Sequence, residues 1–131
     1  MKENDYLASE NEYDEIERKI SLLFIRIGLF SNLKGYDYLI SAVKEVVKNP
    51  KMIHAITKEL YPTVARAFET TPTGVERNIR NAIEVACNRG RFYSVVNAYY
   101  GTNFNRYEKP TNGEFIAFLS NAVTRDFAQV K

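Results

Sequence analysis

Apolar residues recur every three to four positions along almost the whole chain, which is the spacing of helices that bury one face. The first three stripes of this kind are Ile16, Ile20, Leu23 and Ile27; Leu39, Ala42, Val43, Val46 and Val47; and Ile53, Ile56 and Leu60. Gly28 and the pair Asn49-Pro50 are placed to end the first two helices. We find no strict alternation typical of β-strands, so the pattern predicts an all-α fold, a compact bundle of six to seven helices.

The segment from Pro62 to Gly90 predicts a helix-turn-helix motif. Pro62 suits the first turn of a short helix that reaches Phe68, because that turn does not use the N–H that proline lacks. Residues 69–71 predict a turn, and a longer helix is expected over residues 72–88, ended by Gly90. A short helix, a tight turn and a longer helix are typical of helix-turn-helix proteins, whose second helix enters the DNA major groove.

Two further helices are expected after this motif. Residues 92–100 predict a short helix that Gly101 stops, and the polar residues 102–110 predict an exposed loop. Thr111 and Glu114 have the spacing of a capping box, in which each side chain binds a backbone N–H of the other residue. A final helix is therefore expected to begin there.

The helix over residues 72–88 is apolar on one side and polar on the other. Its apolar positions are Val75, Ile79, Ala82, Ile83 and Ala86, and its polar positions are Arg77, Arg80, Asn81, Glu84 and Asn88. Such a polar face is often plain solvated surface, but the short helix and turn before it favour DNA reading. The side chains suit that role, because arginine donates two hydrogen bonds to guanine and glutamate accepts one from cytosine.

The first turns of this helix supply the candidate DNA contacts. The candidate base readers are Glu76 and Arg77, and the candidate phosphate or flanking contacts are Thr71, Thr73, Arg80 and Asn81. The backbone N–H groups at the start of the helix also favour phosphate. Glu76 has a second interpretation, because Thr73 and Glu76 have capping-box spacing and the carboxylate would then bind only backbone N–H groups.

Composition excludes several other functions. The chain has 131 residues, which fits one domain, and its single cysteine excludes an internal disulfide and a cysteine-rich zinc site. Cys87 and the only histidine, His54, lie in helical patterns without a partner motif, and no glycine-rich phosphate loop occurs. We therefore expect no catalytic residue, no metal and no cofactor. Since no apolar run reaches membrane-span length and no signal peptide is present, we expect a cytoplasmic protein without membrane contact.

The formal net charge of +2 is unevenly distributed. Residues 1–19 carry seven acidic and three basic side chains, whereas the remainder carries fifteen basic and nine acidic ones. We expect an acidic, flexible leader over residues 1–14 and a mildly basic helical domain over residues 15–131. Mild basicity agrees with a nucleic-acid partner but is not specific for one.

Several separated motifs resemble the effector domain of the stage-zero sporulation protein A family, the master response regulators of sporulation. They are ITKELYP at residues 56–62, VERNIRNAIEVACNRG at 75–90 and KPTNGEFIA at 109–117, and KGYDYL at 34–39 also fits. Their order and spacing agree with the family from residue 16 to residue 127. The resemblance implies an all-helical transcription regulator that binds double-stranded DNA.

The resemblance also implies which DNA is bound and by which positions. Family members bind short asymmetric boxes related to TGTCGAA, often as tandem head-to-tail copies, through the start of the recognition helix. The matching base readers here are Glu76 and Arg77, with Arg80 and Asn81 beside them for phosphate or flanking contacts. Gly74 stands where familiar members have arginine, and Asn81 where they have histidine, so part of the box preference is expected to differ.

Further partners follow from the resemblance alone. Family regulators form tandem dimers on DNA and contact the RNA polymerase sigma factor through surface that corresponds to residues 84–99. Full-length relatives carry a receiver domain of about 120 residues ahead of this one, so we expect either an excised effector domain or a standalone relative. An alternative of another class is a helical interaction module that dimerises with a full-length regulator through residues 111–127 without binding DNA.

Overall fold

The computed structural model describes residues 2–89, 91–103 and 109–125, with side chains from Glu15 onward. In chain order, its elements are α1 (Lys2–Ile27), α2 (Lys34–Lys48), the 3-10 helix η1 (Pro50–His54), the π-helix η2 (Ile56–Leu60), α3 (Tyr61–Ala67), α4 (Pro72–Asn88), α5 (Arg91–Tyr100) and α6 (Asn112–Thr124). Over the described residues, these six α-helices confirm the predicted all-α fold class.

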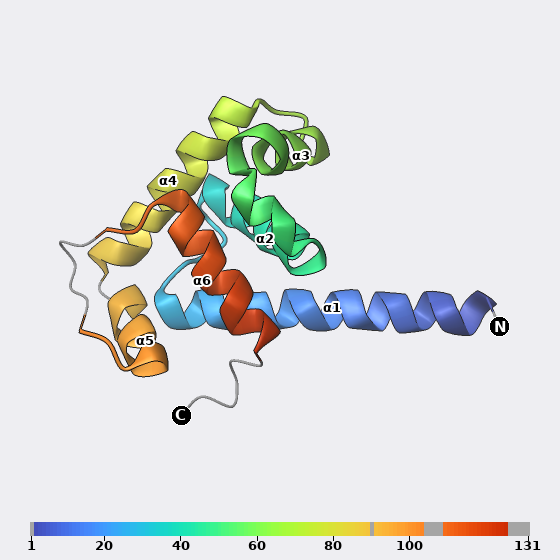
Figure 1. The fold of residues 1–131 in the computed structure, drawn as a ribbon, viewed down its shortest axis with the longest axis horizontal. Helices are drawn as coiled ribbons and strands as arrows, with labels where there is room; N and C mark the ends of the chain where they lie inside the picture. The colour runs from blue at the N-terminus through green and yellow to red at the C-terminus, as the bar shows by residue number, and fades with distance from the viewer. Residues whose placement is uncertain (1, 90, 104–108, 126–131) are drawn as a thin grey trace.

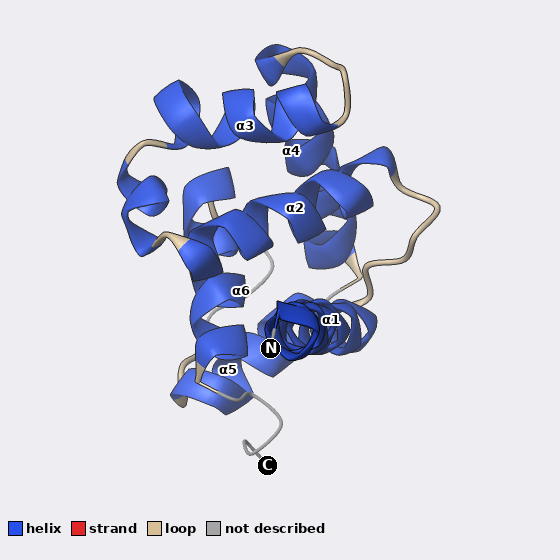
Figure 2. Cartoon of the chain, turned by 90° about the vertical axis from the view of Figure 1, so that its right-hand side faces the viewer, coloured by secondary structure: helices blue, strands red, loops and turns tan. Residues whose placement is uncertain are grey.

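The central helix α2 separates the molecule into two sides. It packs chiefly against α4 and α6, while α1 packs against α2, α5 and α6. Figures 1 and 2 show α3 and α4 on one side of α2 and α1 on the other, with the N-terminal half of α1 extending beyond the remaining helices. The pair α3 and α4 therefore lies at the edge of the body, where one of its faces is free to meet a partner.

A single apolar core holds these helices together. Its largest fully buried side chains are Phe24, Phe115, Ile20, Leu23, Ile27, Leu29, Leu39, Leu60, Ile79, Ile116, Leu119 and Val43. They come from α1, α2, η2, α4, α6 and the loop after α1, so removal of apolar surface from water ties the edge helices to the centre. In α6 the buried residues occupy most of the circumference, because other helices surround it.

The helices α2 and α4 approach each other most closely at Gly35. A Cβ atom added at Gly35 would lie 2.1 Å from the backbone oxygen of Asn78 and 2.9 Å from the Cβ of Ala82. Contacts that short do not occur between real atoms, so only glycine fits here. Gly35 therefore sets the distance between the central helix and α4.

Most predicted helix ends are confirmed. Gly28 after α1 and Gly101 at the end of α5 adopt φ values of 84° and 65°, the left-handed conformation that glycine tolerates best. The capping box of α6 is formed, since the Thr111 hydroxyl accepts from the Glu114 N–H at 3.1 Å and the Glu114 carboxylate accepts from the Thr111 N–H at 2.9 Å. Gly90, expected to end α4, lies outside the described residues.

The single third helix expected from Ile53, Ile56 and Leu60 is wrong, because Ala55 interrupts it. Ala55 leaves the helical conformation at φ −139° and ψ 46°. Its N–H donates to the Met52 carbonyl and so closes η1, and its own carbonyl accepts the first hydrogen bonds of η2. The predicted spacing of apolar residues is present, but two short helices of different type provide it.

The first helix, α1, begins at Lys2, so the backbone of residues 2–14 is helical. The flexibility expected for that leader stays a prediction.

Candidate nucleic-acid interface

The helix-turn-helix predicted from the sequence is present. The α3 helix, the turn of residues 68–71 and the α4 helix follow one another with the expected bounds for α4, Pro72–Asn88. The turn is held by a hydrogen bond from the Thr70 N–H to the Ala65 carbonyl at 2.9 Å, and Glu69 adopts a positive φ of 51°. A tight turn of this kind fixes α4 relative to α3, as DNA reading requires.

The two faces of α4 divide as the sequence predicts. The buried residues are Val75, Ile79, Ala82, Ile83, Ala86 and Cys87, and the exposed polar residues are Arg77, Arg80, Asn81, Glu84 and Asn88. The apolar side packs against α2, α3, α5 and α6. The polar side is therefore held rigidly at the surface by a fully buried opposite side.

The start of α4 is capped by Thr71. The Thr71 hydroxyl oxygen accepts from the Gly74 N–H at 3.0 Å, and Pro72 occupies the first helical position. The capping box considered for Thr73 and Glu76 is therefore wrong, because the N-cap lies two residues earlier. Since a hydroxyl that accepts one bond still has its own proton, Thr71 keeps a donor for an outside phosphate.

Glu76 and Arg80 bind each other. The Nη2 atom of Arg80 lies 2.6 Å from Oε1 and 2.5 Å from Oε2 of Glu76, one helical turn apart. More than half of the Arg80 side chain is exposed. An exposed pair at this spacing contributes only about 0.3–0.5 kcal/mol, so both side chains can exchange this contact for DNA at little cost.

Unlike this pair, the side chains of Arg77 and Asn81 have no partner in the described part of the chain. Both are exposed, and neither side chain makes a hydrogen bond or ion pair with another residue of the described ranges. Arg77 follows directly after Glu76 in the second turn of α4, at the end that carries the partial positive charge of the helix dipole. Its guanidinium is therefore available in full to an outside acceptor.

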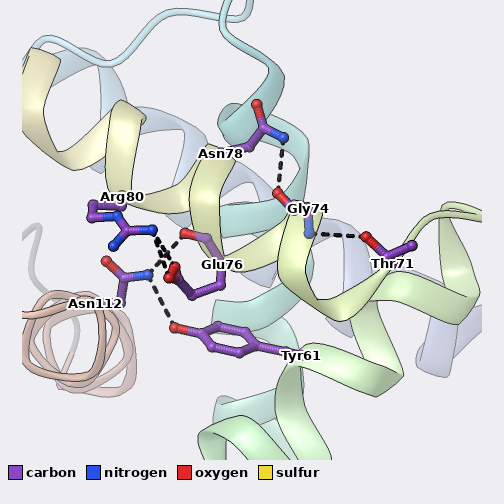
Figure 3. Close-up of polar contacts among 7 residues, drawn as sticks. All are labelled: Tyr61, Thr71, Gly74, Glu76, Asn78, Arg80 and Asn112. Atoms are coloured by element: carbon purple, nitrogen blue, oxygen red, sulfur yellow. Dashed lines mark hydrogen bonds and ion pairs between the residues drawn. The ribbon is translucent and has the colours of Figure 1, made fainter.

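Sequence reasoning missed Asn112, which joins α6 to both helices of the motif. Its side-chain Nδ2 donates to the Tyr61 hydroxyl of α3 at 3.0 Å and to the Glu76 carbonyl of α4 at 3.1 Å (Figure 3). Burial raises the pKa of the Tyr61 phenol, so that group stays protonated at neutral pH. The sequence indicated that a helix begins here, through the capping box of Thr111 and Glu114, but gave no partner for Asn112.

Two basic side chains lie at the start of the motif, Lys58 on η2 just before it and Arg66 on α3, its first helix. Lys58 and Arg66 are exposed and line a recess with Pro62, Thr63 and the exposed acid Glu59, which leaves one net positive charge there. Arg66 donates to the Thr63 hydroxyl at 3.4 Å. In helix-turn-helix proteins the first helix crosses the DNA backbone, so positive charge here is suitably placed for phosphate.

The residues weighed for other chemistry do not assemble into a second site. Cys87 is fully buried, and burial raises the pKa of its thiol, which keeps it protonated and unreactive. His54 lies exposed on η1. Within the described ranges, no group of three or more histidine, cysteine, aspartate or glutamate side chains is placed to hold a metal, and none of the helices could cross a membrane.

Residues 20–123 match the family model described as sporulation initiation factor Spo0A C terminal. The match begins within α1, ends within α6 and covers the whole helix-turn-helix. The resemblance inferred from the separated motifs is thereby confirmed.

Proposed function

We propose, for a chain that belongs to the family of sporulation initiation factor Spo0A C-terminal domains, that α4 reads short boxes of double-stranded DNA in the major groove. Membership makes the chain a DNA-binding domain of a sporulation transcription regulator, in a family that is not one of enzymes. The proposal adds which residues read bases. Glu76 and Arg77 contact base edges, and Thr71, Thr73, Arg80 and Asn81 contact phosphates or flanking positions.

The availability of Arg77 carries this proposal. Its guanidinium is exposed, without a partner in the described part of the chain, and attached to a helix whose opposite face is buried. A free arginine on a rigid support suits bidentate donation to O6 and N7 of guanine. Glu76, the adjacent acceptor, suits cytosine N4, and Arg80 then moves from Glu76 to a phosphate.

The experiment compares two duplexes of the same length and composition. One contains the TGTCGAA box that the family resemblance suggests, and the other contains the same bases in scrambled order. Fluorescence anisotropy is expected to give box binding at least tenfold tighter, since specific and non-specific affinities commonly differ by about 10³ or more. Equal affinity for the two duplexes at every salt concentration would remove this box as the target.

Arg80→Ala is expected to weaken binding to both duplexes by a similar factor. A phosphate contact carries no sequence information, so its loss reduces the salt slope by about one counterion and leaves the discrimination ratio unchanged. Arg18→Ala is the matched control, because Arg18 forms a comparable exposed pair with Glu15 on α1, outside the helix-turn-helix. A salt slope as steep as that of the wild type would show that Arg80 does not contact phosphate.

Gly74→Arg is expected to tighten DNA binding and to steepen the salt slope by about one. Position 74 lies one turn before Arg77, and an added Cβ meets only the Thr71 and Thr70 hydroxyl oxygens, at 3.1 and 3.3 Å. The two hydroxyl groups have to shift by a few tenths of an ångström to accommodate this Cβ. Gly74→Ala introduces the same Cβ without the charge; if it changed the slope as much as Gly74→Arg, a new arginine contact would be refuted.

Tandem dimers on DNA and contact with a sigma factor belong to the same proposal. Both rest on the family resemblance, which assigns the sigma contact to residues 84–99. In that span Glu84, Asn88, Arg89 and Arg91 are exposed at the C-terminal end of α4 and the start of α5, away from the reading turns. A sigma factor bound there would leave Arg77 free for DNA.

The rival function, an interaction module that dimerises through its final helix, gains no support from the packing. Phe115, Ile116, Phe118, Leu119, Ala122 and Val123 of α6 are all buried within the monomer. Phe127, at the end of the proposed dimer segment, lies outside the described residues. A mixed dimer through the described part of this helix would have to use its few exposed positions, such as Glu114 and Thr124.

A further inference from the structure

The start of α6 contacts both helices of the helix-turn-helix through one side chain. The amide of Asn112 donates to the Tyr61 hydroxyl at 3.0 Å and to the Glu76 carbonyl at 3.1 Å, as Figure 3 shows. Tyr61 is the first residue of α3, and Glu76 immediately precedes Arg77 on α4. A single planar group therefore links the two helices at the point where the reading side chains begin.

The support behind this amide is rigid. Asn112 is the first residue of α6, and the capping box of Thr111 and Glu114 fixes the backbone around it. The next residue is Gly113, where an added Cβ would lie 2.9 Å from the Cδ1 atom of Ile56. The absence of a side chain at Gly113 lets the start of α6 approach η2, which leads directly into α3.

We propose that Asn112 is a positioning residue that sets the depth and angle at which α4 enters the groove. This inference rests on the proposed DNA-reading function of α4. The contact to Glu76 is made with its backbone, so it holds the helix and leaves the Glu76 carboxylate free to change partners. Base readout depends on holding side chains within a fraction of an ångström, whereas phosphate contacts tolerate more movement.

A merely stabilising hydrogen bond would behave differently, and the same helix supplies a control. Asn121 of α6 donates its side-chain Nδ2 to the Tyr100 hydroxyl at 3.0 Å, an amide-to-phenol bond like that of Asn112. Tyr100 belongs to α5, outside the helix-turn-helix. Asn112→Ala removes two hydrogen bonds and Asn121→Ala removes one, so their losses of stability differ, but only the loss of Asn112 is expected to disturb base readout.

The test measures the ratio of the dissociation constants for scrambled and box duplexes, together with thermal unfolding, for Asn112→Ala and Asn121→Ala. Asn112→Ala is expected to lower the ratio about tenfold, because a tenfold change in affinity corresponds to the net free energy that one hydrogen bond contributes. Asn121→Ala is expected to leave the ratio within about twofold of the wild type, and thermal unfolding measures how much stability each variant loses. An unchanged ratio in folded Asn112→Ala, or an equal loss in both variants, overturns the inference.

Two further measurements keep the outcome decisive. If Asn112→Ala does not fold, Tyr61→Phe removes the α3 acceptor alone and is expected to lower the ratio about threefold. An unchanged ratio then overturns the inference.

Amide hydrogen exchange without DNA is expected to be faster at residues 74–78 in Asn112→Ala but not in Asn121→Ala. A wild type that prefers neither duplex would refute the box proposal itself, and this exchange difference would still decide whether Asn112 holds α4.

Discussion

Gly35→Ala is expected to lower the free energy of unfolding by about 3 kcal/mol or more, the upper part of the range for overpacking a core. The added Cβ would lie 2.1 Å from the Asn78 backbone oxygen, and a backbone atom cannot rotate away as a side chain can. The helices α2 and α4 would have to separate, which opens the buried contact around Ala82. Thermal unfolding is expected to shift downward by about 10 °C.

Gly113→Ala is the matched control for this substitution. Its added Cβ would also make a contact under 3 Å, but with the terminal atom of the flexible Ile56 side chain. Alanine also favours a helix by up to about 1 kcal/mol over glycine, which offsets the adjustment. The control is therefore expected to unfold within a few degrees of the wild type, and equal losses at both positions would contradict the close approach of α2 and α4.

Arg77→Ala is expected to weaken binding to the box duplex by about 1–3 kcal/mol and to relax the base choice at one position. The physical reason is the loss of both hydrogen bonds that a guanidinium donates to one guanine. Because Arg77 makes no ion pair within the described ranges, its removal is expected to leave thermal unfolding nearly unchanged. Anisotropy titrations against single-base variants of the box provide the measurement.

Arg77→Lys separates charge from geometry. Lysine keeps the positive charge but not the planar fork that donates two bonds, so non-specific affinity is expected to persist while base choice relaxes. If Arg77→Lys discriminated between bases as well as the wild type, Arg77 would contribute only charge. If Arg77→Ala bound the box as tightly as the wild type, Arg77 would not be a reader.

The parts of this fold that could be predicted from the sequence are those fixed by local interactions. The bounds of α4 follow from a proline at its first position and an apolar stripe of constant spacing, and the α6 capping box lies within four residues. The Thr73–Glu76 capping box, the second interpretation of Glu76, is excluded by a local rule as well, because Pro72 at the first helical position favours Thr71 as the N-cap. The Glu76–Arg80 pair has the spacing of a helical ion pair and could also have been anticipated.

The parts that could not be predicted depend on residues distant in sequence. Asn112 and Glu76 are 36 positions apart and meet only because α6 packs against the helix-turn-helix. The close approach at Gly35 likewise depends on how α2 crosses α4. Ala55 interrupts a regular apolar pattern, which shows that spacing predicts the buried side of a segment better than its continuity.

Selection of bound duplexes from a random pool tests the central claim most directly, because it assumes no box in advance. The wild-type chain is expected to enrich one short directional motif related to TGTCGAA, with at least one base altered near the position of Gly74. Selection with Arg77→Ala in parallel is expected to lose information at a single base position. Retention of duplexes without any enriched motif, or an identical motif from both proteins, would contradict the claim that α4 reads bases through Arg77.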